Sequence, residues 1–174
     1  IEQLNNYPWD GNLIFKVTPK SSMAFNLLVR IPGWAQNQAM PSDLYTFQSP
    51  SDKKVEIRVN GQPTAFTLEK GYAVLSRNWK KGDVVEVNLP MEVRRVVANS
   101  NLKDDLGKVA LQRGPLIYCA EWPDNNGNVS NLIVPGEASF TTEFKPAMLK
   151  GVTNLKSEVP AIQIKKKKKV STVN

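Results

Sequence analysis

Histidine is absent from the 174-residue sequence, and its absence removes several common kinds of active site. Without histidine the chain lacks the commonest general base, the Ser-His and Cys-His nucleophile pairs, and almost every usual zinc site. Cysteine occurs once, at Cys119, so no disulfide can form within the chain. Apolar runs are also short, since none approaches the ~18 residues that indicate a membrane span. We therefore expect a soluble protein with no membrane partner.

The start of the sequence does not resemble a leader segment, so we expect either that a leader was removed or that the chain was cut from a longer protein. The sequence starts at Ile1 without an initiator methionine and without the basic and apolar segments of a signal peptide. The segment Asn5-Asn6-Tyr7-Pro8-Trp9 is typical of a linker that leads into a domain. We therefore expect the chain to be part of a longer protein. If that parent carries a signal peptide, its location would be the periplasm or the cell exterior.

The net charge of +7 is concentrated in one place. Residues 165–169 are five consecutive lysines, and without them the net charge would be +2. A nucleic-acid surface would scatter basic residues over a face and interleave them with aromatics, so we expect no nucleic-acid partner. Because strand-like residues flank the run, its lysines could protect a sheet edge or a hairpin tip. An anionic polymer bound by these lysines is the alternative.

Strict alternation of apolar and polar residues dominates the chain, and no helical periodicity stands out. Turn residues separate short alternating runs, and Asn60-Gly61 is a strong hairpin signal. A polar loop is expected at 36–52. The expected strands are 13–17, 25–31, 55–59, 72–77, 84–89, 91–98, 108–121, 132–135, 140–144 and 151–155. This pattern predicts an all-β, antiparallel sandwich fold, with two small packed units of sandwich or jelly-roll type.

A polar stretch at 99–105 interrupts the regular strand spacing and is the expected domain boundary. We therefore predict a first β-sandwich at 1–98 and a second, smaller β unit at 99–164. Residues 165–174 would form a lysine-rich terminal hairpin strand that could complete the first sandwich. The second unit is small for an independent core, so it should pack on the first.

Carboxylates alone can carry out glycoside hydrolysis, so the lack of histidine does not exclude that reaction. No pair of carboxylates in this chain has a recognisable catalytic spacing, however, and we predict no catalytic residue. The carboxylates that could in principle form such a pair are Asp10, Asp43, Asp104, Asp105, Glu121 and Asp124.

Metal and thiol chemistry also find little support in the sequence. Residues 124–128 resemble a calcium loop, but the glycine is misplaced and Pro135 stands where an EF-hand has glutamate. A tight turn rich in asparagine is the favoured interpretation. Cys119 lies inside the apolar strand expected at 116–120 with no base nearby, which indicates a small buried side chain rather than a nucleophile. We predict no cofactor or metal in this chain.

Large aromatic side chains are the remaining candidates for contact with a ligand or another domain. Such rings can cover a seam between domains, or they can stack on sugars. The candidates for either role are Tyr7, Trp9, Trp34, Trp79 and Trp122.

Several segments form a specific set when their order and spacing are taken together: Tyr7-Pro8-Trp9-Asp10-Gly11, Leu27-Leu28-Val29-Arg30-Ile31-Pro32-Gly33-Trp34-Ala35, Val59-Asn60-Gly61, Gly71-Tyr72, Trp79-Lys80-Lys81-Gly82-Asp83, Leu89-Pro90-Met91-Glu92-Val93-Arg94-Arg95 and Gly107-Lys108-Val109-Ala110-Leu111-Gln112-Arg113-Gly114-Pro115-Leu116-Ile117-Tyr118-Cys119. The set resembles the C-terminal β region of family 127 glycoside hydrolases, which are typified by β-L-arabinofuranosidases.

The resemblance implies that the chemistry lies outside this chain. Enzymes of that family have an α/α-barrel catalytic domain followed by β-sandwich domains, and a zinc-bound cysteine in the barrel is their nucleophile. No barrel residue matches this chain, and Cys119 resembles a strand cysteine of the β region. Zinc is therefore expected only in the absent catalytic domain.

Together these points predict a non-catalytic accessory region that braces the catalytic α/α barrel of the same parent chain. The region could also form a subunit interface of a homo-oligomer. The alternative is a carbohydrate-binding module that presents its tryptophans to plant-type glycans.

Overall fold

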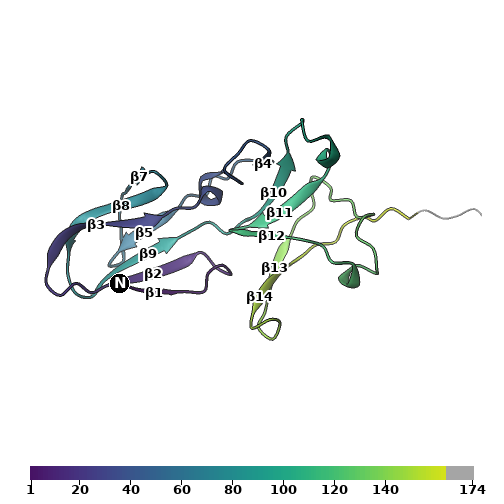
Figure 1. Ribbon diagram of the computed structural model, residues 1–174. Helices are drawn as coiled ribbons and strands as arrows, with labels where there is room; N and C mark the ends of the chain where they lie inside the picture. The colour runs from purple at the N-terminus through teal and green to yellow at the C-terminus, as the bar shows by residue number, and fades with distance from the viewer. Residues whose placement is uncertain (164–174) are drawn as a thin grey trace, which may run out of the picture. The chain divides into compact units, whose positions relative to one another are not determined.

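The chain folds almost entirely into β structure (Figure 1). The structure is a computed structural model that describes residues 1–163, so the lysine run and the predicted terminal strand lie outside the described residues. The chain divides into two compact units, Ile1–Tyr118 (unit 1) and Cys119–Asn174 (unit 2). The domain boundary expected near residue 99 stays a prediction. All named strand pairs in the described residues are antiparallel, which confirms the predicted fold class.

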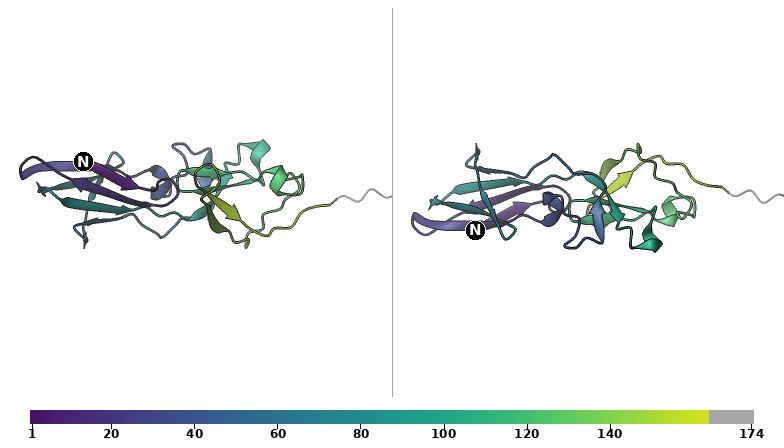
Figure 2. Two further views of the ribbon diagram at one scale, coloured as in Figure 1. Left: turned by 90° about the horizontal axis from the view of Figure 1, so that it is seen from below. Right: turned by 90° about the horizontal axis from the view of Figure 1, so that it is seen from above.

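Unit 1 contains a sandwich of two sheets. The first sheet has the order β1-β2-β9-β5-β6. Its strands are β1 (Glu2–Asn5), β2 (Asn12–Val17), β9 (Asp83–Asn88), β5 (Glu56–Val59) and β6 (Gln62–Pro63). The second sheet has the order β3-β8-β7, with β3 (Met23–Arg30), β8 (Tyr72–Trp79) and β7 (Thr67–Glu69). The longer strands of the two sheets run in similar directions (Figure 2), as is usual for aligned sheets.

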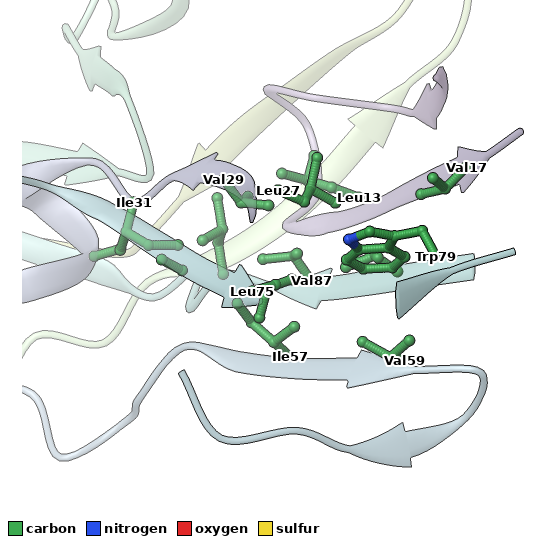
Figure 3. Packing of buried hydrophobic residues seen from close by; sticks show 14 residues of the cluster. Leu13, Val17, Leu27, Val29, Ile31, Ile57, Val59, Leu75, Trp79 and Val87 are labelled. Atoms are coloured by element: carbon green, nitrogen blue, oxygen red, sulfur yellow. The ribbon is translucent and has the colours of Figure 1, made fainter. Parts of the chain in front are cut away.

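The core lies between these two sheets and follows from the alternation in the sequence. Every second residue of a strand points to the same face, so one face of each sheet is apolar. Leu13 and Val17 of β2, Leu27 and Val29 of β3, and Trp79 at the end of β8 all belong to this buried cluster, and the Trp79 ring lies at the end of the core near Val17 (Figure 3). Burial of these side chains is the main driving force for folding of the sandwich.

A four-stranded sheet completes unit 1, in the order β12-β11-β10-β4. Its strands are β12 (Leu116–Tyr118), β11 (Val109–Arg113), β10 (Val93–Ala98) and β4 (Tyr45–Phe47). The 3-10 helices η1 (Gly33–Gln36) and η2 (Lys103–Asp105) lie in the loops of unit 1. Unit 2 contains the 3-10 helix η3 (Trp122–Asp124) and the hairpin of β13 (Thr141–Lys145) and β14 (Val152–Lys156).

Three local predictions differ from the structure. Residues 108–121, expected as one strand, form the two strands β11 and β12, because Gly114 turns the chain with a φ of 57°. The expected loop 36–52 contains β4, which pairs with β10. The expected strand 132–135 makes only a single bridge, between Leu132 and Ala161.

The predicted hairpin at Asn60-Gly61 is confirmed. Both residues have positive φ angles, 54° and 77°, as a type I′ turn between β5 and β6 requires. Asn60 also ties this turn to the beginning of β9. Its side-chain amide donates to Asp83 at 2.9 Å, and its side-chain oxygen accepts from the Val84 amide at 2.8 Å.

Asp83 is the hydrogen-bond partner of Asn60 at this turn. The carboxylate is buried at the edge of the core and accepts a further hydrogen bond from the Lys80 amide at 2.9 Å. The hydrogen bond from the Lys80 backbone and that from the Asn60 side chain lower the pKa of Asp83 below its ordinary value. Ionised Asp83 therefore stabilises the fold by joining the β5–β6 and β8–β9 turns.

Replacement of Asp83 by asparagine should lower the free energy of unfolding at pH 7 by about 1–3 kcal/mol. The reason is that either the Lys80 amide or the Asn60 side-chain amide then loses its charged acceptor. The stabilisation is complete above the unfolded-state pKa of 3.8 and is lost as the pH falls through the lower folded-state pKa. Urea unfolding between about pH 7 and pH 2 should show a flatter pH dependence for Asp83→Asn. Asp52→Asn, at an exposed aspartate without a hydrogen bond or ion pair in residues 1–163, is the control. Equal pH dependence in Asp83→Asn and the unchanged chain would contradict the role of Asp83.

Gly11 allows two backbone segments of the sandwich to approach each other closely. Its carbonyl accepts from the Leu89 amide at 2.9 Å. A Cβ atom at this position would lie 2.1 Å from the Leu89 carbonyl oxygen and 2.9 Å from Cγ of Met91. Because the first of these neighbours is backbone, a side chain at residue 11 would force β2 away from the segment that follows β9.

Gly11→Ala should therefore destabilise unit 1 by about 3 kcal/mol, at the upper end of the usual cost of overpacking. Gly136→Ala is the matched control, since a Cβ there has no heavy atom within 4 Å. The control should change stability by less than about 1 kcal/mol, and in the stabilising direction if the unfolded chain loses entropy. Chemical denaturation of both variants measures the difference, and similar stabilities would refute the close-packing argument.

Candidate functional site

The five candidate aromatic residues lie in three different environments. Trp79 is fully buried, with an exposed fraction of 0%. Its indole N–H donates to the Phe25 carbonyl at 3.0 Å, and the two ring centroids lie 5.8 Å apart. The Arg77 guanidinium lies 5.2 Å from the centre of the same indole ring. Trp79 is thus a core residue, and the interpretation as a sugar contact does not apply to it.

Tyr7, Trp9 and Trp34 lie at a seam within unit 1. The Trp9 carbonyl accepts from the Arg113 guanidinium at 2.9 Å, which fastens the segment before β2 to β11. Trp34 in η1 is half-buried, and its ring edge lies close to Gly114. Tyr7 is 40% exposed. Partial burial raises the pKa of Tyr7, and the neighbouring Trp34 side chain opposes this shift. The Trp9 carbonyl and the Trp34 ring thus connect segments of the sandwich to the part of the chain that forms β11 and the turn after it.

A narrow polar pocket beside Trp34 contains an arrangement that sequence reasoning missed. Arg94 lies 3.4 Å from the centre of the Phe47 ring and donates to the Ser49 carbonyl at 2.7 Å. Burial lowers the pKa of Arg94, and the charge of Glu92 opposes this shift. Glu92 accepts a hydrogen bond from Ser51. Because Ser49 and Ser51 lie more than forty residues before Arg94 and Glu92, no local sequence pattern could have indicated these contacts.

The chemistry available in this pocket is limited. Glu92 also pairs with Lys53 at 3.4 Å, so its charge is already compensated. It is the one carboxylate among the residues that line the pocket, whereas the two-carboxylate mechanism of glycoside hydrolysis needs a pair. The pocket has room for about one water molecule, which is too little for a sugar ring. The arrangement anchors the loop before β5 to β10.

The carboxylates considered from the sequence have local structural roles or are exposed. Asp10 accepts from the Asn12 amide at 3.0 Å in the turn before β2. Asp105 accepts from the Tyr45 hydroxyl at 2.7 Å, and this hydrogen bond raises the pKa of Tyr45. Asp124 lines a groove of unit 2. The others are exposed: Asp43, Asp104 and Glu121.

The described residues do not fit a zinc site of the kind implied by the family resemblance. Within residues 1–163, no cluster of three or more His, Cys, Asp or Glu side chains could hold a metal ion. Cys119 is exposed at the start of unit 2, contrary to the buried position expected from the sequence, because β12 ends before it at Tyr118. Residues 124–128 form a turn in which Asn126 and Gly127 have positive φ angles.

Trp122 differs from the other candidates because its ring is open to solvent. It is the first residue of η3 in unit 2, and 66% of its surface is exposed. Asp124 and Asn125, which follow in the same turn, line a groove along the β13–β14 hairpin. Thr141 and Asn154 lie on that hairpin and also line the groove. The lining of this groove thus begins two residues after Trp122 and combines polar with apolar side chains.

Within the described part of the chain, no helix has the length and apolar character needed to cross a membrane.

Comparison with known proteins gives a consistent assignment along the chain. The family profile "Beta-L-arabinofuranosidase, GH127 middle domain" matches residues 1–91. The profile "Glycoside hydrolase family 127 C-terminal domain" matches residues 93–169. A non-reducing end β-L-arabinofuranosidase from Bifidobacterium longum subsp. longum is 36% identical over 173 residues, which covers 94% of this chain and 23% of that protein.

Solved structures agree with these matches. A GH127 β-arabinofuranosidase superposes with a TM-score of 0.86 at 38% identity, over 94% of this chain and 26% of the other. A GH127 β-L-arabinofuranosidase from Geobacillus stearothermophilus T6 gives a TM-score of 0.76 at 37% identity, over 89% of this chain and 22% of the other. The chain thus spans about a quarter of the length of these relatives. Since family-specific profiles match nearly its whole length, the chain belongs to glycoside hydrolase family 127.

Proposed function

We propose that the chain is a non-catalytic accessory region of a β-L-arabinofuranosidase-type glycoside hydrolase and that it braces the catalytic α/α barrel of its parent protein. The observation that carries this proposal is the position of the matches. They cover the middle and C-terminal domains of the family, while the relatives are about four times as long as the chain. The parent would cleave terminal β-L-arabinofuranose, as the name of the B. longum relative states for that protein.

The contacts of unit 1 suit a bracing role. The segment around Trp9 is fixed to β11 through Arg113, and Gly11 is packed directly against Leu89. Both contacts hold the segment before β2 on two different sheets. Because packed sheets resist deformation, this segment would stay in a fixed position. A barrel docked on it would then be held in place. The partly exposed ring of Tyr7 is available for contact with the barrel.

The same region would also contribute to a subunit interface of a homo-oligomer. For the whole protein we propose export to the periplasm or the exterior, where plant-type glycans are met. A leader peptide in the parent reading frame is the observation that tests this location.

Removal of residues 1–174 from the parent enzyme should impair the barrel. We expect the midpoint of thermal unfolding of the barrel to fall by about 5 °C or more. We also expect kcat/KM for an aryl β-L-arabinofuranoside to fall by about tenfold or more, because small displacements of active-site loops have large kinetic effects. Addition of the separate 174-residue chain should restore part of both losses. The chain alone should show no metal-dependent hydrolysis of the same substrate.

Two results would contradict this proposal. A truncated enzyme with unchanged stability and unchanged kcat/KM would show that the barrel needs no brace. Appreciable hydrolysis by the chain alone would show that the region is itself catalytic. Addition of the Gly11→Ala chain controls for non-specific stabilisation, since the disturbed sandwich should restore less than the unchanged chain.

A further inference from the structure

Trp122 is exposed to a degree that is unusual for an indole ring. Two-thirds of its surface contacts solvent in unit 2. Tryptophan side chains are mostly buried in monomeric proteins. A solvent-exposed indole, which has an apolar ring and an N–H donor, is typical of a contact surface. Its turn is held by backbone hydrogen bonds to the Trp122 carbonyl from the Asn125 amide at 3.2 Å and from the Gly127 amide at 2.8 Å. The backbone of this exposed residue is therefore well defined.

The groove that begins at this turn has a mixed lining, in which polar and charged side chains alternate with the apolar side chains of Pro146, Ala147, Met148 and Leu155. Of the polar lining residues, Asp124 and Asn125 come from the turn itself, while Thr141, Asn154 and Ser157 come from the β13–β14 hairpin and the residue after it. Within residues 1–163, the side chains of Asp124 and Asn154 make no hydrogen bond or ion pair, so their donors and acceptors are available. Hydroxyl, amide and carboxylate groups next to an aromatic ring are the combination that sugars require, because a sugar has an apolar ring face and a polar rim.

The charges of the groove do not favour an anionic ligand. Lys145 and Lys156, which both line it, pair with the same Glu143 carboxylate. Hydrogen bonds from the two lysines lower the pKa of Glu143 below its ordinary value, so the carboxylate stays charged. The free carboxylates of Asp124 and Glu158 add negative charge to the lining. A phosphate, a nucleic acid or an acidic polysaccharide would meet no excess of positive charge here.

We propose that Trp122 and the adjoining groove of unit 2 bind a neutral oligosaccharide. One sugar ring stacks on the exposed indole, and the hydroxyls of the following units bond to groups such as Asn154 and Asp124. The groove volume of about 1140 Å³ accommodates more than one sugar unit. The proposal is independent of the bracing function, because that function rests on unit 1 and this site lies in unit 2. It also separates Trp122 from Trp79, whose buried ring cannot stack on a ligand.

The test is a titration of the whole 174-residue chain with arabinotetraose, xylotetraose and cellotetraose, followed by NMR of the four indole N–H groups. Loss of one signal in Trp122→Ala assigns the Trp122 resonance. We expect at least one of these sugars to shift that resonance in a saturable way. The Trp79 resonance should stay in place, since its N–H is bonded to the Phe25 carbonyl.

Trp122→Ala should weaken binding by about tenfold or more, as the loss of an aromatic contact predicts. Asn154→Ala should weaken it by about threefold or more, through the loss of a hydrogen bond. Ile117→Ala is the control, because Ile117 is 60% exposed but lies in β12 of unit 1. Three results would overturn the proposal: no shift with any sugar, unchanged affinity in Trp122→Ala, or equal weakening in Trp122→Ala and Ile117→Ala.

Discussion

Contact between the two apolar sheet faces of unit 1 is the interaction on which the rest of that unit depends. Each sheet alone would expose its row of buried side chains, such as Val85 and Val87 of β9, to water. Trp79 makes the contact specific, because its large ring fills one place in the core and its N–H must reach the Phe25 carbonyl. A one-residue slip of β8 would move this ring to the solvent side and leave that donor without its partner. Register and core packing therefore reinforce each other.

The polar contacts at the ends of the sandwich preserve this register. Asn60 and Asp83 join two turns that are far apart in the sequence, and they do so at the point where β9 begins. Gly11 performs the same task at the other end of β9, since its missing side chain lets Leu89 bond to it directly. Neither contact adds much apolar burial. Their effect is to fix β9 between β2 and β5, and the buried side chains of all three strands then meet β3 and β8.

Local sequence patterns predicted the parts of the fold that depend on local physics. Alternation over a few residues identified β2, β3, β5, β8 and β9, and the Asn60-Gly61 pair identified the tightest hairpin. The pattern failed where pairing alone creates a strand. Strand β4 has only three residues within a polar stretch, and it exists because β10, about fifty residues later, offers an edge. A single bridge at Leu132 shows the converse, since an apolar run without a partner strand does not become one.

The site residues follow the same division between local and distant causes. The aromatic candidates could be recognised in the sequence by residue type alone. The burial of each ring, however, depends on partners that the local sequence does not reveal. Trp79 precedes two lysines and still lies in the core, because the register with β3 places it there. Glu92 and Arg94 were missed because their partners belong to the loop before β5. Within residues 1–163 the Trp122 ring makes no aromatic or cation–π contact, and its backbone is held by its own turn. A ring whose position is fixed locally can stay exposed without loss of structure, and this makes Trp122, rather than the buried or half-buried rings, the aromatic residue that is free to contact a ligand.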